Sequence, residues 1–172
     1  GKAPAALRDI PQSVMVVDRA VMDDQAVASL TEALRNVPGI TISAGEGGNI
    51  GDNINLRGYS ARTDVYVDGF RDRGQYSRDT FALDAVEVLK GPASFLHGGN
   101  PLSGAVQLER KQPQAKRFAE LALGYGRYGT FDGAVDANAS TSDGRVSARL
   151  NATWQGTDGY RDLPEGSILG VN

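Results

Sequence analysis

The strongest constraint on the fold lies in the last third of the chain, where apolar and polar residues alternate through three consecutive segments. These segments are residues 119–125, 131–140 and 146–155. Because successive side chains of a β-strand point to opposite faces, the alternation predicts strands with one apolar and one polar face. Short turns separate the segments, so we expect three antiparallel strands of about ten residues each.

Two environments are compatible with such a sheet. An antiparallel meander in a water-soluble protein also has one buried face and one solvated face. The aromatic residues favour the wall of a transmembrane β-barrel, because Tyr125, Phe131 and Trp154 are predicted at one level of the apolar face, as in an interfacial aromatic belt. Three strands cannot close a barrel, and open strand edges are not tolerated in lipid. We therefore expect the chain to be a fragment of a longer barrel protein.

The first two thirds of the chain predict short elements joined by many turns. A capping box, Ser29-Leu30-Thr31-Glu32, begins a helix that ends at Pro38-Gly39. Asp18 is a predicted N-cap for a helix over 19–23, and Asp68-Gly69 suits a primed hairpin turn. Strands are predicted at 14–17, 53–57, 63–67, 85–89 and 105–110, a further helix at 92–96 and a flexible tail at 1–8. Short mixed elements of this kind indicate a small α+β unit.

Composition excludes several classes of function. The chain has no cysteine and one histidine, His97, which rules out disulfides, thiolate metal sites and multi-histidine metal sites. A net charge of −3 argues against a general nucleic-acid binder. The sequence contains no nucleophile elbow, Walker A loop or zinc-protease motif, so we expect neither an enzyme nor a resident metal or cofactor.

Several short motifs occur in a fixed order. They are Pro11-Gln12-Ser13-Val14, Leu56-Arg57-Gly58-Tyr59, Val65-Tyr66-Val67-Asp68-Gly69, Val86-Glu87-Val88-Leu89-Lys90-Gly91-Pro92 and Gly104-Ala105-Val106, followed by Lys111-Gln112-Pro113. With these motifs, residues 9–113 closely resemble the plug domain of TonB-dependent outer-membrane receptors. The resemblance implies an α+β plug at 9–113, and at 114–172 the first three strands of an incomplete 22-stranded barrel.

The same resemblance implies a function and a location. A plug sits inside its barrel and gates the uptake of a scarce nutrient across the outer membrane of a Gram-negative bacterium. TonB, energised from the inner membrane, would pull on a segment upstream of residue 9, and the outside of the barrel would face outer-membrane lipid. Receptors for cobalamin or glycans share this plug pattern, and a soluble plug-like interaction module is a further alternative.

The loop at residues 71–79 is similar to a plug loop of ferric catecholate siderophore receptors, and it carries four residues suited to that ligand: Arg71, Arg73, Tyr76 and Arg78. Iron(III) held by three catecholates is a trianion with aromatic rings on its outside. Arginine offers charge and a planar face, and tyrosine offers a ring and a hydroxyl. Tyr59 and His97 are expected at the same apex. Because Asp72 and Asp79 are interleaved, a salt-bridged solvated loop is the alternative.

Two basic residues stand where the receptor family places cations that pair with carboxylates of the barrel wall. These are Arg57 in Leu56-Arg57-Gly58 and Lys90 in Leu89-Lys90-Gly91. A charge in a narrow lumen needs a partner, because removing it from water unpaired is unfavourable. We therefore expect Arg57 and Lys90 to dock the plug to the barrel. The alternative is that both simply keep the plug soluble.

Overall fold

The computed structural model describes residues 13–43, 51–91, 104–157 and 166–171. The chain divides into two compact units, unit 1 (residues 1–110) and unit 2 (residues 111–172). The predicted tail at 1–8 and the predicted helix at 92–96 lie outside the described residues. No helix within the described ranges is long and apolar enough to cross a membrane.

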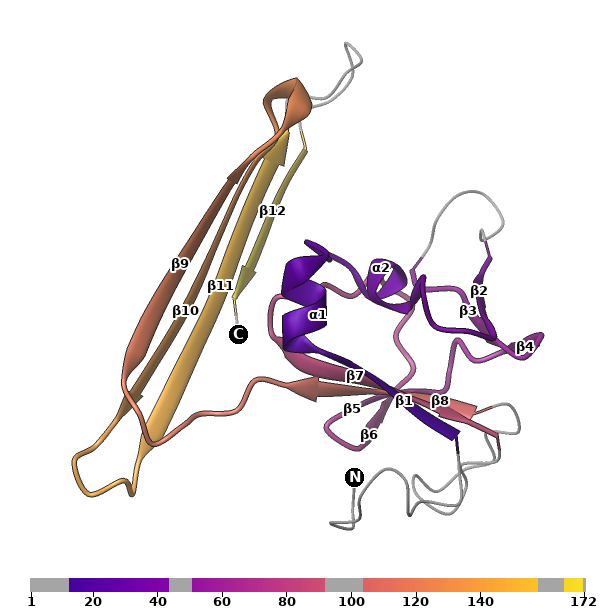
Figure 1. Cartoon of the computed structure of the whole chain (residues 1–172), viewed down its shortest axis with the longest axis horizontal. Helices are drawn as coiled ribbons and strands as arrows, with labels where there is room; N and C mark the ends of the chain where they lie inside the picture. Colours follow the sequence, from indigo (N-terminus) through magenta and orange to yellow (C-terminus); the bar gives the residue numbers. More distant parts are fainter. Residues whose placement is uncertain (1–12, 44–50, 92–103, 158–165, 172) are drawn as a thin grey trace. The chain divides into compact units, whose positions relative to one another are not determined.

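Unit 1 contains a five-stranded mixed sheet and a smaller three-stranded sheet (Figure 1). The larger sheet has the order β1 (Ser13–Asp18), β7 (Leu83–Lys90), β8 (Gly104–Arg110), β5 (Val65–Val67) and β6 (Phe70–Asp72). Within it β5 and β8 are parallel, and all other neighbours are antiparallel. The smaller sheet is antiparallel and has the order β2 (Ile40–Ile42), β3 (Ile54–Leu56) and β4 (Tyr59–Ser60).

Two short helices begin at the predicted caps. The Asp18 carboxylate accepts a hydrogen bond from the Val21 amide and caps α1 (Arg19–Asp24). The predicted capping box is present at α2 (Leu30–Leu34), where Ser29 and Glu32 each bind the other's backbone amide. Local side-chain chemistry therefore sets both helix starts.

The core of unit 1 is apolar and lies between the helices and one face of the larger sheet (Figure 1). Fully buried members from the helices and strands are Met22, Leu30, Leu34, Ile54, Leu56, Val65, Val86, Val88 and Val106. The opposite face of the sheet carries a second, smaller cluster around Tyr66 and Leu89. The predicted turn between β5 and β6 is confirmed, since Asp68 and Gly69 have φ angles of 47° and 86°.

Unit 2 is a four-stranded antiparallel sheet with the order β12, β11, β10, β9. Its strands are β9 (Phe118–Tyr125), β10 (Phe131–Ser140), β11 (Ser147–Thr157) and β12 (Gly166–Val171). The three predicted strands are present, and the prediction of three was one short. β12 was missed because its six residues, Gly-Ser-Ile-Leu-Gly-Val, are too short and too glycine-rich to show alternation.

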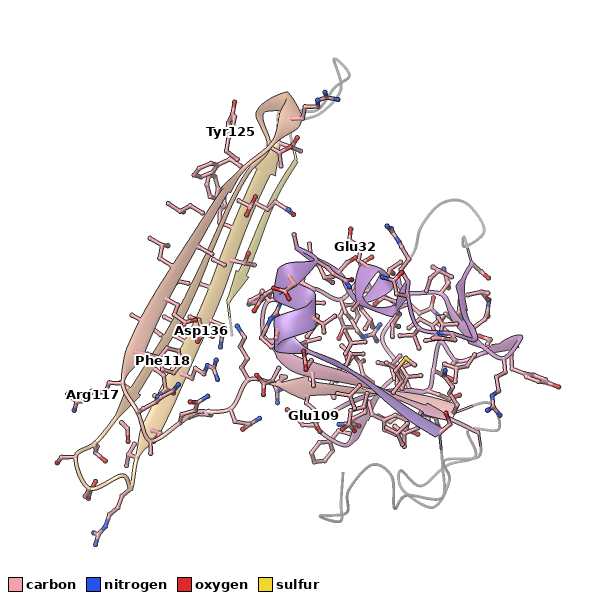
Figure 2. The ribbon with its side chains drawn as sticks, viewed as in Figure 1. Glu32, Glu109, Arg117, Phe118, Tyr125 and Asp136 are labelled. Carbon is pink, nitrogen blue, oxygen red and sulfur yellow. The ribbon has the colours of Figure 1, made fainter. Side chains whose placement is uncertain are left out.

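The register of unit 2 places the expected aromatic residues together. Tyr125 pairs with Phe131, and Trp154 pairs with Gly133, so all three aromatic side chains share the apolar face near one end of the sheet. The rings of Phe131 and Trp154 meet edge to face with centroids 4.6 Å apart. Asp136 lies on the opposite, polar face, away from Tyr125 (Figure 2).

Candidate functional site

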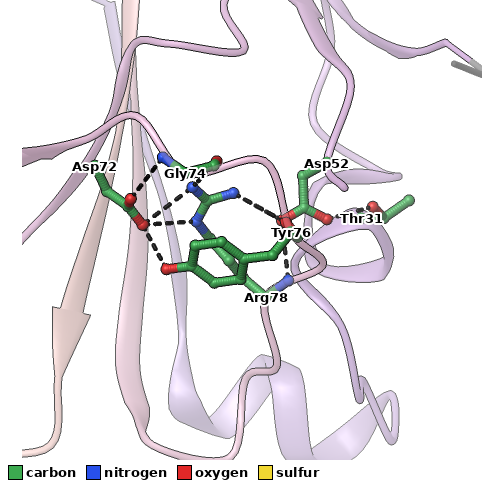
Figure 3. Close-up of polar contacts among 6 residues, drawn as sticks. All are labelled: Thr31, Asp52, Asp72, Gly74, Tyr76 and Arg78. Carbon is green, nitrogen blue, oxygen red and sulfur yellow. Dashed lines mark hydrogen bonds and ion pairs between the residues drawn. The ribbon is translucent and has the colours of Figure 1, made fainter. Parts of the chain in front are cut away.

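The loop that follows β6 is built around a buried arginine (Figure 3). The side chain of Arg78 is only 4% exposed. Its Nε and Nη2 donate to Asp72 Oδ2 at 3.2 and 3.0 Å, and its Nη1 donates to Asp52 Oδ2 at 3.2 Å. The remaining N–H groups reach the Gly74 and Tyr76 carbonyls at 2.9 and 3.3 Å. Every donor of the guanidinium is therefore used inside the protein.

Asp52 joins this loop to the rest of unit 1. Its carboxylate accepts hydrogen bonds from the Arg78 amide at 3.0 Å and from the Thr31 hydroxyl of α2 at 3.2 Å. The Arg78 carbonyl in turn accepts from the Leu30 amide at 2.8 Å, at the start of α2. Charge-assisted bonds of this kind are among the stronger polar contacts in a protein. The loop is thus fixed to α2 and to the residues before β3.

Tyr76 lies on the outside of the buried arginine. The Arg78 guanidinium is 4.3 Å from the ring centroid of Tyr76, a cation–π contact. The Tyr76 hydroxyl donates to Asp72 Oδ2 at 2.5 Å. The side chain is nevertheless about half exposed. Its hydroxyl proton is committed to Asp72, so the exposed part of the ring is what Tyr76 offers to a ligand.

The pKa values of the two aspartates in this loop, Asp72 and Asp79, are shifted in opposite directions. Burial raises the pKa of Asp72, but hydrogen bonds from Tyr76, Gly74 and Arg78 outweigh it, so the pKa of Asp72 lies below its ordinary value. Burial, and next the charge of Asp52, raise the pKa of Asp79. The hydrogen bond to Asp72 raises the pKa of Tyr76, which keeps its phenol protonated.

The structure separates the four arginine and tyrosine residues predicted to bind the ligand. Arg73 is exposed, and no hydrogen bond or ion pair holds its side chain among the described residues. Arg71 is held by Asp64 at 2.6 Å and by the Thr63 carbonyl at 2.7 Å, so it keeps only a partly exposed charge. Arg78 is buried and binds Asp52 and Asp72, and its predicted contact with the ligand stays a prediction.

The remaining predicted site residues lie on other segments. Tyr59, on β4, is 67% exposed, and His97 lies outside the described residues. Arg57 is exposed in the turn between β3 and β4, and its Nη1 lies 3.9 Å from where a Cβ on Gly91 would be, next to Lys90. Among the residues that the structure describes, no carboxylate forms an ion pair with Arg57 or Lys90.

A second polar cluster, which sequence reasoning missed, lies in unit 2. Residues 111–117, here called the strap, bind the polar face of β10 and β11. Asp136 accepts from Lys111 Nζ at 2.9 Å and from Arg149 Nε and Nη2 at 2.8 and 2.7 Å. Asn138 donates to and accepts from the Gln114 backbone at 2.7 and 2.9 Å, and it also bonds the Lys116 carbonyl. The available signal was the set of polar residues on one face of the predicted strand 131–140, namely Asp132, Asp136, Asn138 and Ser140.

The strap is fastened at both ends. Arg149 Nη1 donates to the Gln112 carbonyl at 3.0 Å, and Arg117 Nε donates to the Ser140 carbonyl at 3.0 Å. Lys111, Asp136 and Arg149 are largely buried as a result. Within the described ranges, no three His, Cys, Asp or Glu side chains gather to hold a metal ion. The clusters found here thus bind protein groups to one another.

Comparison with known proteins agrees with this architecture. Residues 6–105 match the family described as the TonB-dependent Receptor Plug Domain. The probable TonB-dependent receptor BfrD of Bordetella pertussis is 38% identical over 151 residues, which cover 87% of this chain and 20% of the relative. The catecholate siderophore receptor Fiu of Escherichia coli K12 is 35% identical over 167 residues, covering 95% of this chain and 22% of the relative.

Solved structures show the same similarity in three dimensions. The siderophore receptor PiuA from Acinetobacter baumannii superposes with a TM-score of 0.89 at 34% identity, over 97% of this chain and 24% of that one. The closed form of Fiu gives a TM-score of 0.86 at 34% identity, over 95% and 23% of the two chains. The chain thus spans about a fifth to a quarter of the length of these proteins. It belongs to the TonB-dependent receptors of the Gram-negative outer membrane, a family of receptors and not of enzymes, and it carries their plug domain.

Proposed function

We propose that this chain is part of a receptor that binds a ferric catecholate siderophore and imports it with energy supplied through TonB. One observation supports the ligand class above others: one loop of unit 1 presents Arg73, a cation without an ion pair among the described residues, and the half-exposed aromatic ring of Tyr76. A ferric tris-catecholate is a trianion whose outer surface is aromatic, so it matches both groups. The similarity to Fiu and PiuA supports the same ligand class.

The sheet of unit 2 suits the first strands of a barrel wall. The face that carries Tyr125, Phe131 and Trp154 would contact outer-membrane lipid, and the polar face that binds the strap would face the lumen. The remainder of a 22-stranded barrel would come from a chain of the relatives' length. Iron would be cargo, carried in by the siderophore, and the protein would need no resident cofactor.

Arg57 and Lys90 are proposed to dock the plug. The guanidinium of Arg57 lies beside Gly91, the residue that follows Lys90, and neither cation has a carboxylate partner among the described residues. Carboxylates on the rest of the barrel wall would supply the partners, and pairing would seat the plug as a gate. TonB would act through a segment upstream of residue 9. Arg71, Tyr59 and His97 are proposed as further ligand contacts.

Binding measurements on the full-length receptor test the ligand assignment. The probe is iron(III) with three equivalents of 2,3-dihydroxybenzoate, followed by tryptophan quenching. Removing one desolvated, charge-assisted contact by Arg73→Ala weakens binding by about tenfold to a hundredfold, on the order of 1.5–3 kcal/mol. Gln75→Ala, at an exposed position between Gly74 and Tyr76, is the matched control.

A neutral iron(III) tris-acetohydroxamate complex distinguishes the ligand class. It lacks both the net charge and the aromatic rings, so the wild-type receptor should prefer the catecholate clearly. Equal binding of both complexes, or unchanged catecholate affinity in Arg73→Ala and Tyr76→Ala together, would contradict the proposal. A receptor for cobalamin or a glycan would give that result.

A further inference from the structure

The loop from Asp72 to Arg78 has one conformation fixed from within. All N–H groups of the Arg78 guanidinium donate hydrogen bonds to Asp72, Asp52 and two loop carbonyls. Asp72 also accepts a hydrogen bond from the Gly74 amide at 2.9 Å. Loss of both carboxylates would leave the buried guanidinium of Arg78 without a counter-charge, which is strongly unfavourable. The loop is thus ordered without help from a ligand.

The Tyr76 residue is closely packed against the backbone at Gly74 and Gly51. A Cβ on Gly74 would lie 2.5 Å from Tyr76 Cε1, and a Cβ on Gly51 would lie 2.7 Å from the Tyr76 amide nitrogen. Real Cβ atoms do not approach so closely, so only glycine permits this arrangement of ring and backbone at either position. The Arg78 guanidinium and the Asp72 carboxylate hold the ring and its hydroxyl. Half of the side chain nevertheless remains exposed.

We propose that Arg78 is a positioning residue of the ligand site: from inside the protein it holds the Tyr76 ring as a preformed platform that stacks on an aromatic ring of the ligand. This inference rests on the proposed function. It gives the buried Arg78 an indirect role in ligand binding, through Tyr76. Preformed groups bind more tightly than mobile ones, because less conformational freedom is lost on binding. The exposed part of the Tyr76 ring, rather than its hydroxyl proton, carries the contact.

The charge beneath the ring also favours one kind of ligand. An aromatic face carries negative potential, which opposes an anionic, electron-rich ring stacked upon it. A guanidinium against the ring offsets that potential, as in any cation–π pair. The Tyr76 platform therefore suits an iron-bound catecholate ring better than an isolated tyrosine would. A neutral chelate without rings gains nothing from it.

Gly74→Ala tests the platform without changing any charge. Gly74 does not have a positive φ, so alanine introduces no backbone strain there, but its Cβ would overlap the Tyr76 ring and displace it from this position. In the full-length receptor we expect affinity for iron(III) tris-2,3-dihydroxybenzoate to fall by about threefold to tenfold, the range of one aromatic pair. Affinity for iron(III) tris-acetohydroxamate should stay unchanged. Gln75→Ala, one residue along the same loop, is the control and should bind both complexes normally.

Arg78→Lys completes the test through a double-mutant cycle. Lysine keeps the charge but lacks the planar fork, so it cannot hold Asp72, Asp52 and the ring together. Its loss of catecholate affinity should match that of Tyr76→Ala, and the double variant should lose no more than Tyr76→Ala alone. A merely structural role would instead weaken both probes, or add to the Tyr76→Ala loss. Should Arg78→Lys fail to fold, Gly74→Ala still decides the question.

The outcomes separate this inference from the function on which it rests. If Tyr76→Ala weakens catecholate binding while Gly74→Ala and a folded Arg78→Lys bind normally, positioning by Arg78 is wrong and the ligand assignment stands. If Tyr76→Ala and Arg73→Ala both bind normally, the ligand assignment itself fails. Selective loss of the catecholate in Tyr76→Ala and Gly74→Ala, without additivity, supports both.

Discussion

The two units of the chain bury opposite kinds of side chain. In unit 1 the buried set is mainly apolar, with Leu30 and Leu34 fully inaccessible beneath the sheet. In unit 2, Leu121 and Leu123 expose 67% and 68% of their surface, while Asn138, on the opposite face of the sheet, is buried against the strap. Apolar side chains are therefore buried in unit 1 and exposed on one face of the sheet in unit 2.

The difference is the one expected if unit 1 is surrounded by water and unit 2 is in contact with lipid, as proposed above. Apolar surface in water is unfavourable by roughly 25 cal/mol per Å², so unit 1 places it inside. Unit 2, with one apolar and one polar face, would satisfy the opposite requirement if, as proposed, lipid contacts the apolar face and water fills the lumen on the polar side. The polar cluster around Asp136 lies on the polar face of the sheet, which agrees with this proposal.

The largest expected effect is on solubility, and it tests this contrast directly. Expressed alone in water, the 172-residue chain should aggregate through the exposed face of unit 2, which has Leu121, Leu123, Val146, Leu150 and Trp154 uncovered. A chain limited to residues 1–110 should stay monomeric, because its apolar core is internal. Size-exclusion chromatography and amide-proton dispersion compare the two. A monomeric, well-dispersed full chain would mean that unit 2 is a water-soluble sheet.

The strap offers a second test, at the polar face. In the full-length receptor, Asp136→Ala leaves Lys111 and Arg149 without their shared carboxylate, an effect on the order of 3–5 kcal/mol for a buried pair. The temperature at which the folded band converts to the unfolded band on a detergent gel should fall. Asp132→Ala is the matched control, on the same strand and face and without an ion pair among the described residues. Equal shifts in both variants would show that the strap contacts add no stability.

The Arg57→Ala variant tests whether a carboxylate outside the described residues pairs with unit 1. If a carboxylate of the barrel wall pairs with it, Arg57→Ala leaves that carboxylate alone, at a cost of about 3 kcal/mol. Looser seating of the plug should then raise permeation by large antibiotics. Arg62→Ala, exposed and unpaired among the described residues of the same unit, serves as the control. An Arg57 variant as tight as the parent would favour plain solvation.

Local signals in the sequence predicted much of the fold. The N-cap at Asp18, the capping box at Ser29 and the primed turn at Asp68-Gly69 each depend on residues within four positions of one another, and all are present. The alternation in unit 2 predicted β9, β10 and β11 and the shared level of the aromatic residues. Hydrophobic periodicity and helix capping depend on residues close together in the chain, so both can be predicted from the sequence alone.

The parts that escaped prediction depend on contacts between distant residues. Arg78 was expected at the ligand because its loop is similar to a plug loop of ferric catecholate receptors; its burial, through the contact with Asp52 26 residues earlier, was not predicted. The strap was missed because Asn138 and Arg149 bind backbone groups 24 and 37 residues away. Side-chain to backbone bonds of this range have no periodic pattern to reveal them. Of the residues predicted to bind the ligand from this loop, Arg73 and Tyr76 have exposed side chains, and their contact with a ligand stays a prediction.

The smallest expected effects are on the pH dependence of folding stability. Asp72 and Asp79, two aspartates of the same loop, should change it in opposite directions. The pKa of Asp72 is lowered in the folded state, so its ionised form adds stability above its ordinary value of 3.8, and this is lost as pH falls through the folded pKa. The pKa of Asp79 is raised by burial and by Asp52, so its ionised form lowers stability as pH rises above 3.8. Urea unfolding of residues 1–110 at several pH values measures both.

At neutral pH, Asp72→Asn should therefore destabilise unit 1 by about 1–2 kcal/mol, because a partly buried partner of Arg78 loses its charge. Asp79→Asn should stabilise it by roughly 0.5 kcal/mol or less, since the side chain is largely exposed and screened. The Asp72→Asn difference should shrink as the pH falls below 3.8 and through the lowered pKa of Asp72. The Asp79→Asn difference should shrink at higher pH, as the pH falls through the raised pKa of Asp79 toward 3.8. Equal effects of the two variants would show that the loop does not distinguish them, and that Arg78 is held by general electrostatics and not by the specific bonds to Asp72.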